Sequence, residues 1–139
     1  MTIRSYRDLE VWQKSVTLIV ECYKLTRGFP KTEQYGLSSQ LQRSAASVAA
    51  NIAEGNGRRN LGEYIQHLGI ARGSLLELET HVIVAHRLAF VTSAQADVVL
   101  AAAAEVGRML AGLIRSLETL ARRRAREAPA PGPRSPAPA

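Results

Sequence analysis

Apolar residues recur at alternating steps of three and four along four stretches of the chain, which short segments containing glycine, proline, serine or threonine separate. This spacing places apolar side chains on one face of a helix and predicts four amphipathic helices at residues 7–27, 33–54, 61–90 and 93–126. The longest unbroken row belongs to the third helix and consists of Leu61, Tyr64, Leu68, Ala71, Leu75, Leu78, Val82, Ala85 and Ala89. No stretch shows the period of two that a half-buried strand requires.

The first predicted helix carries two apolar rows. One row has the heptad spacing of a buried seam and comprises Leu9, Trp12, Val16, Ile19 and Tyr23. The other row comprises Val11, Leu18, Cys22 and Leu25. A helix with two such rows contacts more than one neighbour, either inside a bundle or at a subunit contact.

The second predicted helix carries small side chains. Its alanines are Ala45, Ala46, Ala49, Ala50 and Ala53. They leave one side of the helix without bulk, so a neighbouring helix can approach closely. Its apolar row is Leu37, Leu41, Ala45, Val48 and Ile52. We expect Gly55 and Gly57 to end this helix through a left-handed backbone, which glycine adopts readily.

Polar residues mark the starts of the last two helices. Asn60, with a glutamate three residues later, resembles a capping box, and Thr92 or Ser93 caps the fourth helix. Gly69 and Gly73 each weaken the third helix by roughly 1 kcal/mol relative to alanine, so we expect both to mark close helix contacts. The apolar row of the fourth helix is Val99, Ala103, Val106, Leu110, Leu113, Leu117 and Leu120.

Short turns between four helices predict an all-α, up-down-up-down antiparallel four-helix bundle that occupies residues 1–126. Five of the six prolines lie in residues 127–139, a Pro/Ala-rich tail that we expect to be disordered or polyproline-like. The length suits one domain. The chain has no apolar signal core near its start, and Glu105 and Arg108 interrupt the apolar run near Val98, so we expect no export and no membrane span. The single cysteine cannot form an intrachain disulfide, which favours the cytoplasm.

The net charge of +6 is unevenly distributed. Residues 122–139 hold five arginines and one glutamate, a net charge of +4, whereas residues 1–121 carry only +2. Arginine binds phosphate well, so we expect contacts to nucleic acid from Arg122, Arg123, Arg124 and Arg126, with Arg58 and Arg59 secondary. The alternative is a solvated helix end whose cations complement the helix dipole. Aromatic residues form only 5% of the chain, too few for base stacking, so binding would be electrostatic and weakly sequence-specific.

A polar stripe follows one face of the second helix and consists of Gln40, Ser44, Ser47, Asn51, Glu54 and Arg58. It is either a solvated face or the partner of Ser74, Glu77 and His81 on the third helix, across a helix or subunit contact. In the second interpretation, Glu77 or Glu79 would form ion pairs with Arg43, Arg58 or Arg72. The structural or interface residues would then be Arg43, Asn51, Glu54, Ser74, Glu77 and Glu79.

The spacing of reactive side chains argues against an enzyme. A histidine follows Glu63 and Glu77 at a distance of four residues in each case, at His67 and His81. Di-metal bundles use Glu-x-x-His, a distance of three, so we expect no metal site. Cys22 lies on an apolar row, and no nucleophile–base set has suitable spacing. Gly55-x-Gly57 follows a helix rather than a strand, so it is no phosphate loop. We therefore expect no catalytic residue and no cofactor.

A series of short motifs in residues 6–90 is specific enough to suggest a family. The motifs are Leu9…Trp12-Gln13, Phe29-Pro30…Glu33-Gln34-Tyr35-Gly36-Leu37…Gln40-Leu41…Arg43, Asn51-Ile52-Ala53-Glu54-Gly55…Gly57-Arg58, and Ile70-Ala71…Gly73-Ser74…Glu77-Leu78-Glu79. Their order resembles the bacterial four helix bundle protein family, also called the 23S rRNA intervening-sequence protein family. The fourth helix is similar only in character, and the arginine-rich tail is not part of the pattern.

The resemblance implies a protein without established enzymatic activity that assembles as a homopentamer. It also implies a relationship to the accessory protein of diversity-generating retroelements, which binds nucleic acid. We therefore expect a non-enzymatic oligomeric bundle that binds RNA or DNA electrostatically, as an assembly or accessory factor. Two alternatives stay open. One is a protein–protein adaptor, such as an accessory subunit of a retroelement reverse transcriptase, and the other is an enzyme or ligand-binding bundle.

Overall fold

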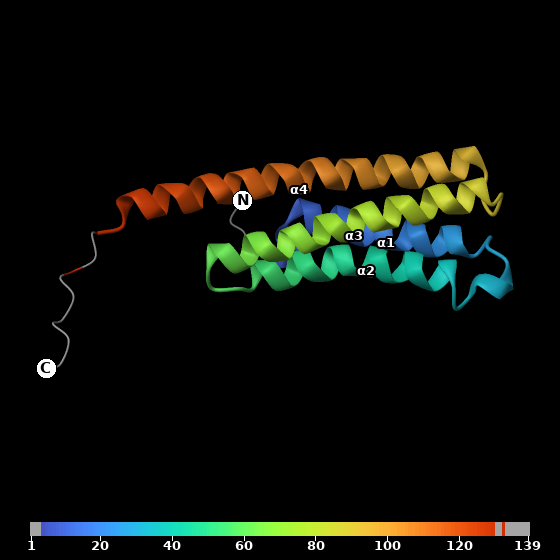
Figure 1. Ribbon diagram of the computed structural model, residues 1–139, viewed down its shortest axis with the longest axis horizontal. Coiled ribbons are helices and arrows are strands. Elements are labelled where there is room, and N and C mark those ends of the chain that lie inside the picture. The colour runs from blue at the N-terminus through green and yellow to red at the C-terminus, as the bar shows by residue number, and fades with distance from the viewer. Residues whose placement is uncertain (1–3, 130–131, 133–139) are drawn as a thin grey trace, which may run out of the picture.

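The computed structural model describes residues 4–129 and 132, so most of the expected tail lies outside the described residues. Its four long helices are α1 (Glu10–Thr26), α2 (Leu37–Asn56), α3 (Leu61–Arg87) and α4 (Ser93–Glu127). They run side by side along the length of the molecule (Figure 1). The described part of the chain contains no strand. The prediction of an all-α four-helix bundle is confirmed.

The helices pack in a square. Contacts join α1 to α2, α2 to α3, α3 to α4 and α4 back to α1, whereas the diagonal pairs do not pack against each other. Two short 3₁₀ turns, Tyr6–Asp8 and Lys31–Glu33, precede α1 and α2. Because of these turns, α1 begins at Glu10 rather than residue 7, and α2 begins at Leu37 rather than residue 33.

Helix α4 is longer than the bundle. Its 35 residues span about 52 Å at 1.5 Å per residue, whereas α3 has 27 residues and α2 has 20. The last turns of α4 therefore extend past the α2–α3 connection, where no other helix lies beside them (Figure 1).

The core includes most of the predicted rows of α2, α3 and α4 but fully buries only one row of α1. Leu61, Ala89 and Leu120, at the ends of the predicted rows, lie outside it. The buried residues of α1 include Val11, Ser15, Leu18, Cys22 and Leu25. The predicted row through Trp12 lies at the edge of the bundle, where Leu9, Trp12 and Ile19 are half-buried and pack against the core, whereas Tyr23 is 46% exposed. Ser15 completes the buried row, since its hydroxyl donates to the carbonyl oxygen of Val11 at 2.7 Å and is satisfied without solvent.

Helices α2 and α3 pack most closely near their connection. A Cβ on Gly55 would lie 2.8 Å from Cβ of His67 and 3.1 Å from Cδ1 of Tyr64, so only glycine fits there. A Cβ on Gly69 or Gly73 would meet nothing within 4 Å. The expectation that Gly69 and Gly73 mark close contacts was therefore wrong, since Gly55 has that role.

The left-handed backbone occurs at another connection. Gly57 ends α2 with φ −80°, so the predicted left-handed turn is absent there. Ala89, after α3, has φ 61°. The N–H of Phe90 donates to the carbonyl of Ala85 at 2.9 Å, and that of Ala89 donates to His86 at 3.0 Å, the Schellman pattern. The ring of Phe90 lies 5.7 Å from that of Phe29, which joins both connections at this end of the bundle.

The buried row of α3 offers a stability test with an adjacent control. Leu75 is 2% exposed and Leu76 is 57% exposed. We expect Leu75→Ala to lower the free energy of unfolding by about 2 to 5 kcal/mol through lost burial and the cavity left behind. Leu76→Ala should change it by about 0.5 kcal/mol or less. Urea unfolding followed by circular dichroism measures both, and equal effects would contradict the assignment of this seam.

Replacing a glycine by alanine should lower the stability of the protein at one position of the α2–α3 pair and raise it at another. Gly55→Ala should destabilise the protein by about 1 to 3 kcal/mol, because the added methyl overpacks the contact with His67. Gly73→Ala adds a methyl in open space within a helix and should stabilise the protein by about 0.5 to 1 kcal/mol. Thermal unfolding of the two variants compares these signs directly. A stabilising Gly55→Ala would show that the two helices do not approach this closely.

Candidate functional site

The arginines singled out from the sequence gather at one end of the molecule. Arg58 and Arg59 lie at the connection between α2 and α3, and residues 122–126 form the last turns of α4. In Figure 1 this connection and the protruding end of α4 point the same way. All six arginines are exposed. Two runs that lie more than 60 residues apart in sequence thus share one end of the bundle.

The periodicity of α4 separates its arginines by face. Arg122, Arg123 and Arg126 line one open cleft together with Thr119 and Glu127. Arg124 follows Leu117 by seven residues, which places it on the continuation of the apolar row. The predicted cluster of four arginines is therefore a group of three on one face and one arginine turned away.

Two further arginines extend this face toward the middle of α4. Arg108 and Arg115 precede Arg122 at steps of seven residues, and both are exposed. Together with Arg126 they form a line about 27 Å long at 1.5 Å per residue. We call Arg108, Arg115, Arg122 and Arg126 the basic stripe. The sequence prediction missed its first two members, although their seven-residue spacing was a usable signal.

The charges of this end are mostly unneutralised. Within the described residues, Arg58 forms an ion pair with Glu54, with Nη2 2.6 Å from Oε1, and the other arginines named here form none. Residues 115–127 hold five arginines and two glutamates, a net charge of +3. An exposed surface of this sign attracts polyanions, and its guanidinium groups suit phosphate oxygens.

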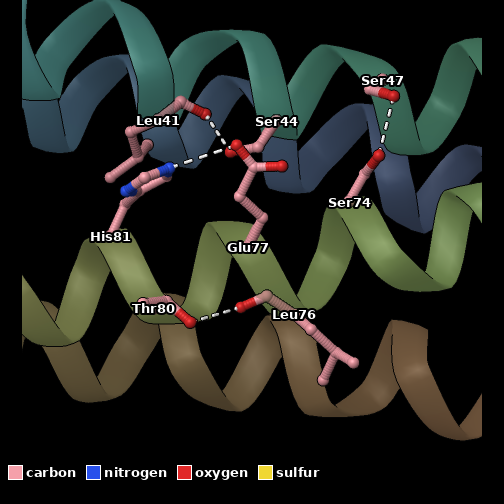
Figure 2. A network of polar contacts seen from close by, with 8 residues as sticks. All are labelled: Leu41, Ser44, Ser47, Ser74, Leu76, Glu77, Thr80 and His81. Carbon is pink, nitrogen blue, oxygen red and sulfur yellow. Dashed lines mark hydrogen bonds and ion pairs between the residues drawn. The ribbon is translucent and has the colours of Figure 1, made fainter.

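The polar stripe of α2 was predicted to be either a solvated face or a contact with the third helix, and each interpretation holds for some of its members. Its inner members contact α3, because the hydroxyls of Ser47 and Ser74 lie 2.8 Å apart (Figure 2). Nδ2 of Asn51 donates to the carbonyl of Ser47 at 2.9 Å, which turns Oδ1 toward Nδ1 of His67, 3.1 Å away. Nδ1 must then carry the proton, since two acceptors cannot share this bond. The outer members, Gln40, Glu54 and Arg58, are exposed.

The expected ion pairs between α2 and α3 do not form within the described residues of this chain. Glu77 instead approaches Nε2 of His81 on its own helix at 3.4 Å (Figure 2). Arg43 is exposed, Glu79 is half-buried, and neither has an ion-pair partner among the described residues. Hydrogen bonds, rather than salt bridges to acidic residues, connect the polar side chains of the two helices.

The single thiol is enclosed in the core. Cys22 is 0% exposed, and this burial, followed by the neighbouring charge of Glu21, raises its pKa to about 12. A thiol with such a pKa stays protonated near neutral pH and is a poor nucleophile. Among residues 4–129, no three histidine, cysteine or acidic side chains are grouped so that they could hold a metal ion. Nor does any described helix have the length and apolar character needed to cross a membrane.

Two comparisons relate this architecture to known proteins. A family model described as 23S rRNA-intervening sequence protein matches residues 7–112. The fold is similar to the crystal structure of a protein of unknown function from the S23 ribosomal protein family of Bacteroides thetaiotaomicron VPI-5482, with a TM-score of 0.68 and 25% sequence identity. This similarity covers 75% of the present chain and 97% of the other. No curated protein matches the sequence.

Proposed function

Because the chain belongs to the 23S rRNA-intervening sequence protein family, we propose that it is a non-enzymatic helical-bundle protein that binds RNA or DNA through charge. The observation that carries this proposal is the basic stripe on α4, whose end projects beyond the bundle (Figure 1). A projecting helix can lie along a nucleic acid without a clash from the other three helices. Arg58 and Arg59, at the same end, supply secondary contacts.

The dimensions of the basic stripe suit a polyphosphate. Duplex DNA presents one negative charge per about 1.7 Å of its axis, so a stripe of about 27 Å faces roughly 16 phosphate charges. Only part of them can be reached from one side. The stripe, Arg123 and the arginines at the α2–α3 connection provide seven guanidinium groups, enough to neutralise several phosphates per chain.

The side chains around the basic stripe favour contacts to phosphates over contacts to bases. The exposed aromatic rings, Tyr23 and Tyr35, lie at the opposite end of the bundle, near the α1–α2 connection. Tyr6, Trp12 and Tyr64 lie at the arginine end but are half-buried, so they offer bases little ring surface on which to stack. Binding should therefore depend strongly on salt and weakly on base sequence.

We further propose that the protein assembles with copies of itself, as a homopentamer. The edge row of α1, which comprises Trp12, Val16, Ile19 and Tyr23, supports this because its own bundle leaves it partly exposed. Outward positions of α2 carry Ala46 and Ala50, which are exposed and small enough for a close subunit contact. A cyclic ring would use two different faces of each subunit and would gather five copies of the basic end.

A protein-binding adaptor is the second candidate function. Leu76 and Ile83 lie seven residues apart on α3 and are 57% and 46% exposed. Exposed leucine and isoleucine on one face favour a protein partner over a polyanion. A reverse transcriptase would be a partner of this kind.

Replacing the arginines tests the nucleic-acid proposal. In the variant Arg115→Gln/Arg122→Gln/Arg123→Gln/Arg126→Gln we expect affinity for a DNA duplex or a structured RNA to fall by about tenfold or more at low salt, because several phosphate contacts disappear. If about six to ten phosphates are neutralised, wild-type affinity should fall by roughly 10³ to 10⁵ between about 50 and 200 mM salt. Fluorescence anisotropy measures both effects.

The matched control replaces the same four arginines by lysine, which keeps the charge. This control should retain most of the affinity, since neutralisation of phosphates by either lysine or arginine drives binding of this kind. Truncation after Leu120 removes an exposed helix end and should preserve the fold while weakening binding. Equal affinities for wild type and the glutamine variant would eliminate the basic stripe as the site. No binding at low salt would favour the adaptor.

Light scattering tests the assembly. We expect a mass about five times the 15.1 kDa of one chain, and a smaller mass for Val16→Asp/Tyr23→Asp, because buried charges would disrupt the contact made by the edge row of α1. Val98→Asp is the control, since Val98 is 60% exposed on α4, outside this row. A wild-type mass of one chain at micromolar concentration would refute self-assembly.

A further inference from the structure

The end of the bundle opposite the arginines contains an open cleft of about 420 Å³. It lies where α1 passes through the turn Lys31–Glu33 into α2 (Figure 1). Its lining includes Tyr23, Arg27, Lys31 and Ser38 but no acidic residue. The volume falls in the range of about 300 to 1,000 Å³ that is typical of small-molecule sites. The lining thus combines an aromatic ring, two cations and a hydroxyl around a space of ligand size.

Backbone donors are available at the start of α2, beside this cleft. The N–H of Leu37 donates to Oε2 of Glu33 at 3.1 Å, and the N–H of Gln40 donates to the carbonyl of Gly36 at 3.1 Å. The N–H groups of Ser38 and Ser39 have no acceptor among the described residues. Unpaired N–H groups and the positive end of the helix dipole together favour an anion at this position.

A hydroxyl without a protein partner borders the same cleft. Ser38 is only 8% exposed, and its side chain forms no hydrogen bond with any described residue. Its neighbours are satisfied, because Oγ1 of Thr26 donates to the carbonyl of Tyr23 at 2.9 Å and accepts from Nε2 of Gln42 at 3.0 Å. Among the described residues, no side-chain nitrogen or oxygen is both fully buried and unpartnered, so the hydroxyl of Ser38 reaches the surface. Ser38 lines the cleft, so its hydroxyl is free to bond to a group bound there.

Charge around the cleft is mostly positive. Arg27 and Lys31 are exposed, and neither forms an ion pair within the described residues. Glu33 is the opposing charge, and its carboxylate is held against the first N–H of α2. Gly36 permits this position, since a Cβ there would lie 2.7 Å from Oε2 of Glu33. Glu33 occupies one backbone donor and leaves the next two accessible.

We propose that this cleft binds a small organic phosphate of nucleotide size. The phosphate would accept hydrogen bonds from Ser38 and from the N–H groups of Ser38 and Ser39, with Arg27 and Lys31 balancing its charge. So many donors suit the three terminal oxygens of a phosphate monoester better than the two of a carboxylate. Tyr23 and the 7% exposed Phe29 provide apolar walls for an attached ring. The proposal does not depend on the nucleic-acid proposal, because the basic stripe lies elsewhere.

Titration of the full chain with adenosine 5′-monophosphate tests the site by calorimetry and by amide NMR. We expect saturable binding with a Kd of about 1 mM or tighter and selective shifts of the Ser38 and Ser39 amides. Adenosine, which lacks the phosphate, should bind at least about tenfold more weakly, since hydrogen bonds to charged groups are lost. The double variant Arg27→Gln/Lys31→Gln should lose a similar factor.

Two single substitutions sharpen the test. Ser38→Ala should weaken binding several-fold, and Glu33→Gln should tighten it several-fold, because the first removes a donor and the second removes a repelling charge. Arg72→Gln, at an exposed position on α3 that does not line the cleft, is the control and should bind like wild type. The glutamine and alanine variants must keep the helical circular dichroism of wild type.

Three results would each overturn the proposal. The first is the absence of heat and of amide shifts with about 5 mM adenosine 5′-monophosphate, well above the expected Kd. The second is equal affinity for adenosine, which would locate binding on the rings alone. The third is equal affinity of the wild type and of Ser38→Ala, together with amide shifts away from Ser38 and Ser39.

Discussion

The close contact between α2 and α3 is the constraint on which the rest of the bundle depends. Gly55 lets the two helices approach closely near their connection, and the Ser47–Ser74 and Asn51–His67 hydrogen bonds fix how they align lengthwise. A shift of one turn along either helix would part both bonds, and it would move Gly55 away from the position where α3 leaves no room for a Cβ. Alignment of α2 and α3 in turn places α1 and α4, since each packs on one of them. The arginines at the α2–α3 connection and the end of α4 are brought together by the same alignment.

The helices could be predicted because each carries an apolar face with a clear period. This period does not depend on which other helices each one packs against. The choice between the two rows of α1 could not be predicted. Both rows have helical spacing, and the one that faces the core includes Ser15, whose polarity is hidden by its bond to the carbonyl of Val11. Turn geometry was equally dependent on context. Glycine at residue 57 suggested a left-handed turn, but the structure places that conformation at Ala89, where the contact of Phe90 with Phe29 fixes the path of the chain.

The candidate sites also differ in how far the sequence could predict them. A run of arginines at residues 122–126 is visible in the sequence, whereas Arg108 and Arg115 become part of the same surface only through the helical repeat. The cleft beside Ser38 was not predictable, because it depends on a turn between helices and on backbone donors that no side-chain pattern reports. Apolar periodicity locates what is buried, but it carries little information about concave surfaces.

The projecting end of α4 has a thermodynamic consequence of its own. Helices in proteins gain most of their stability from packing, and this segment has no neighbouring helix (Figure 1). Its arginines also repel one another, which opposes helix formation at low ionic strength. An anion bound along it would relieve that repulsion. Helix formation in this segment and binding of the anion therefore become linked equilibria. Amide hydrogen exchange in these last turns would then report on ligand binding, while the bundle beneath them exchanges on a much slower timescale.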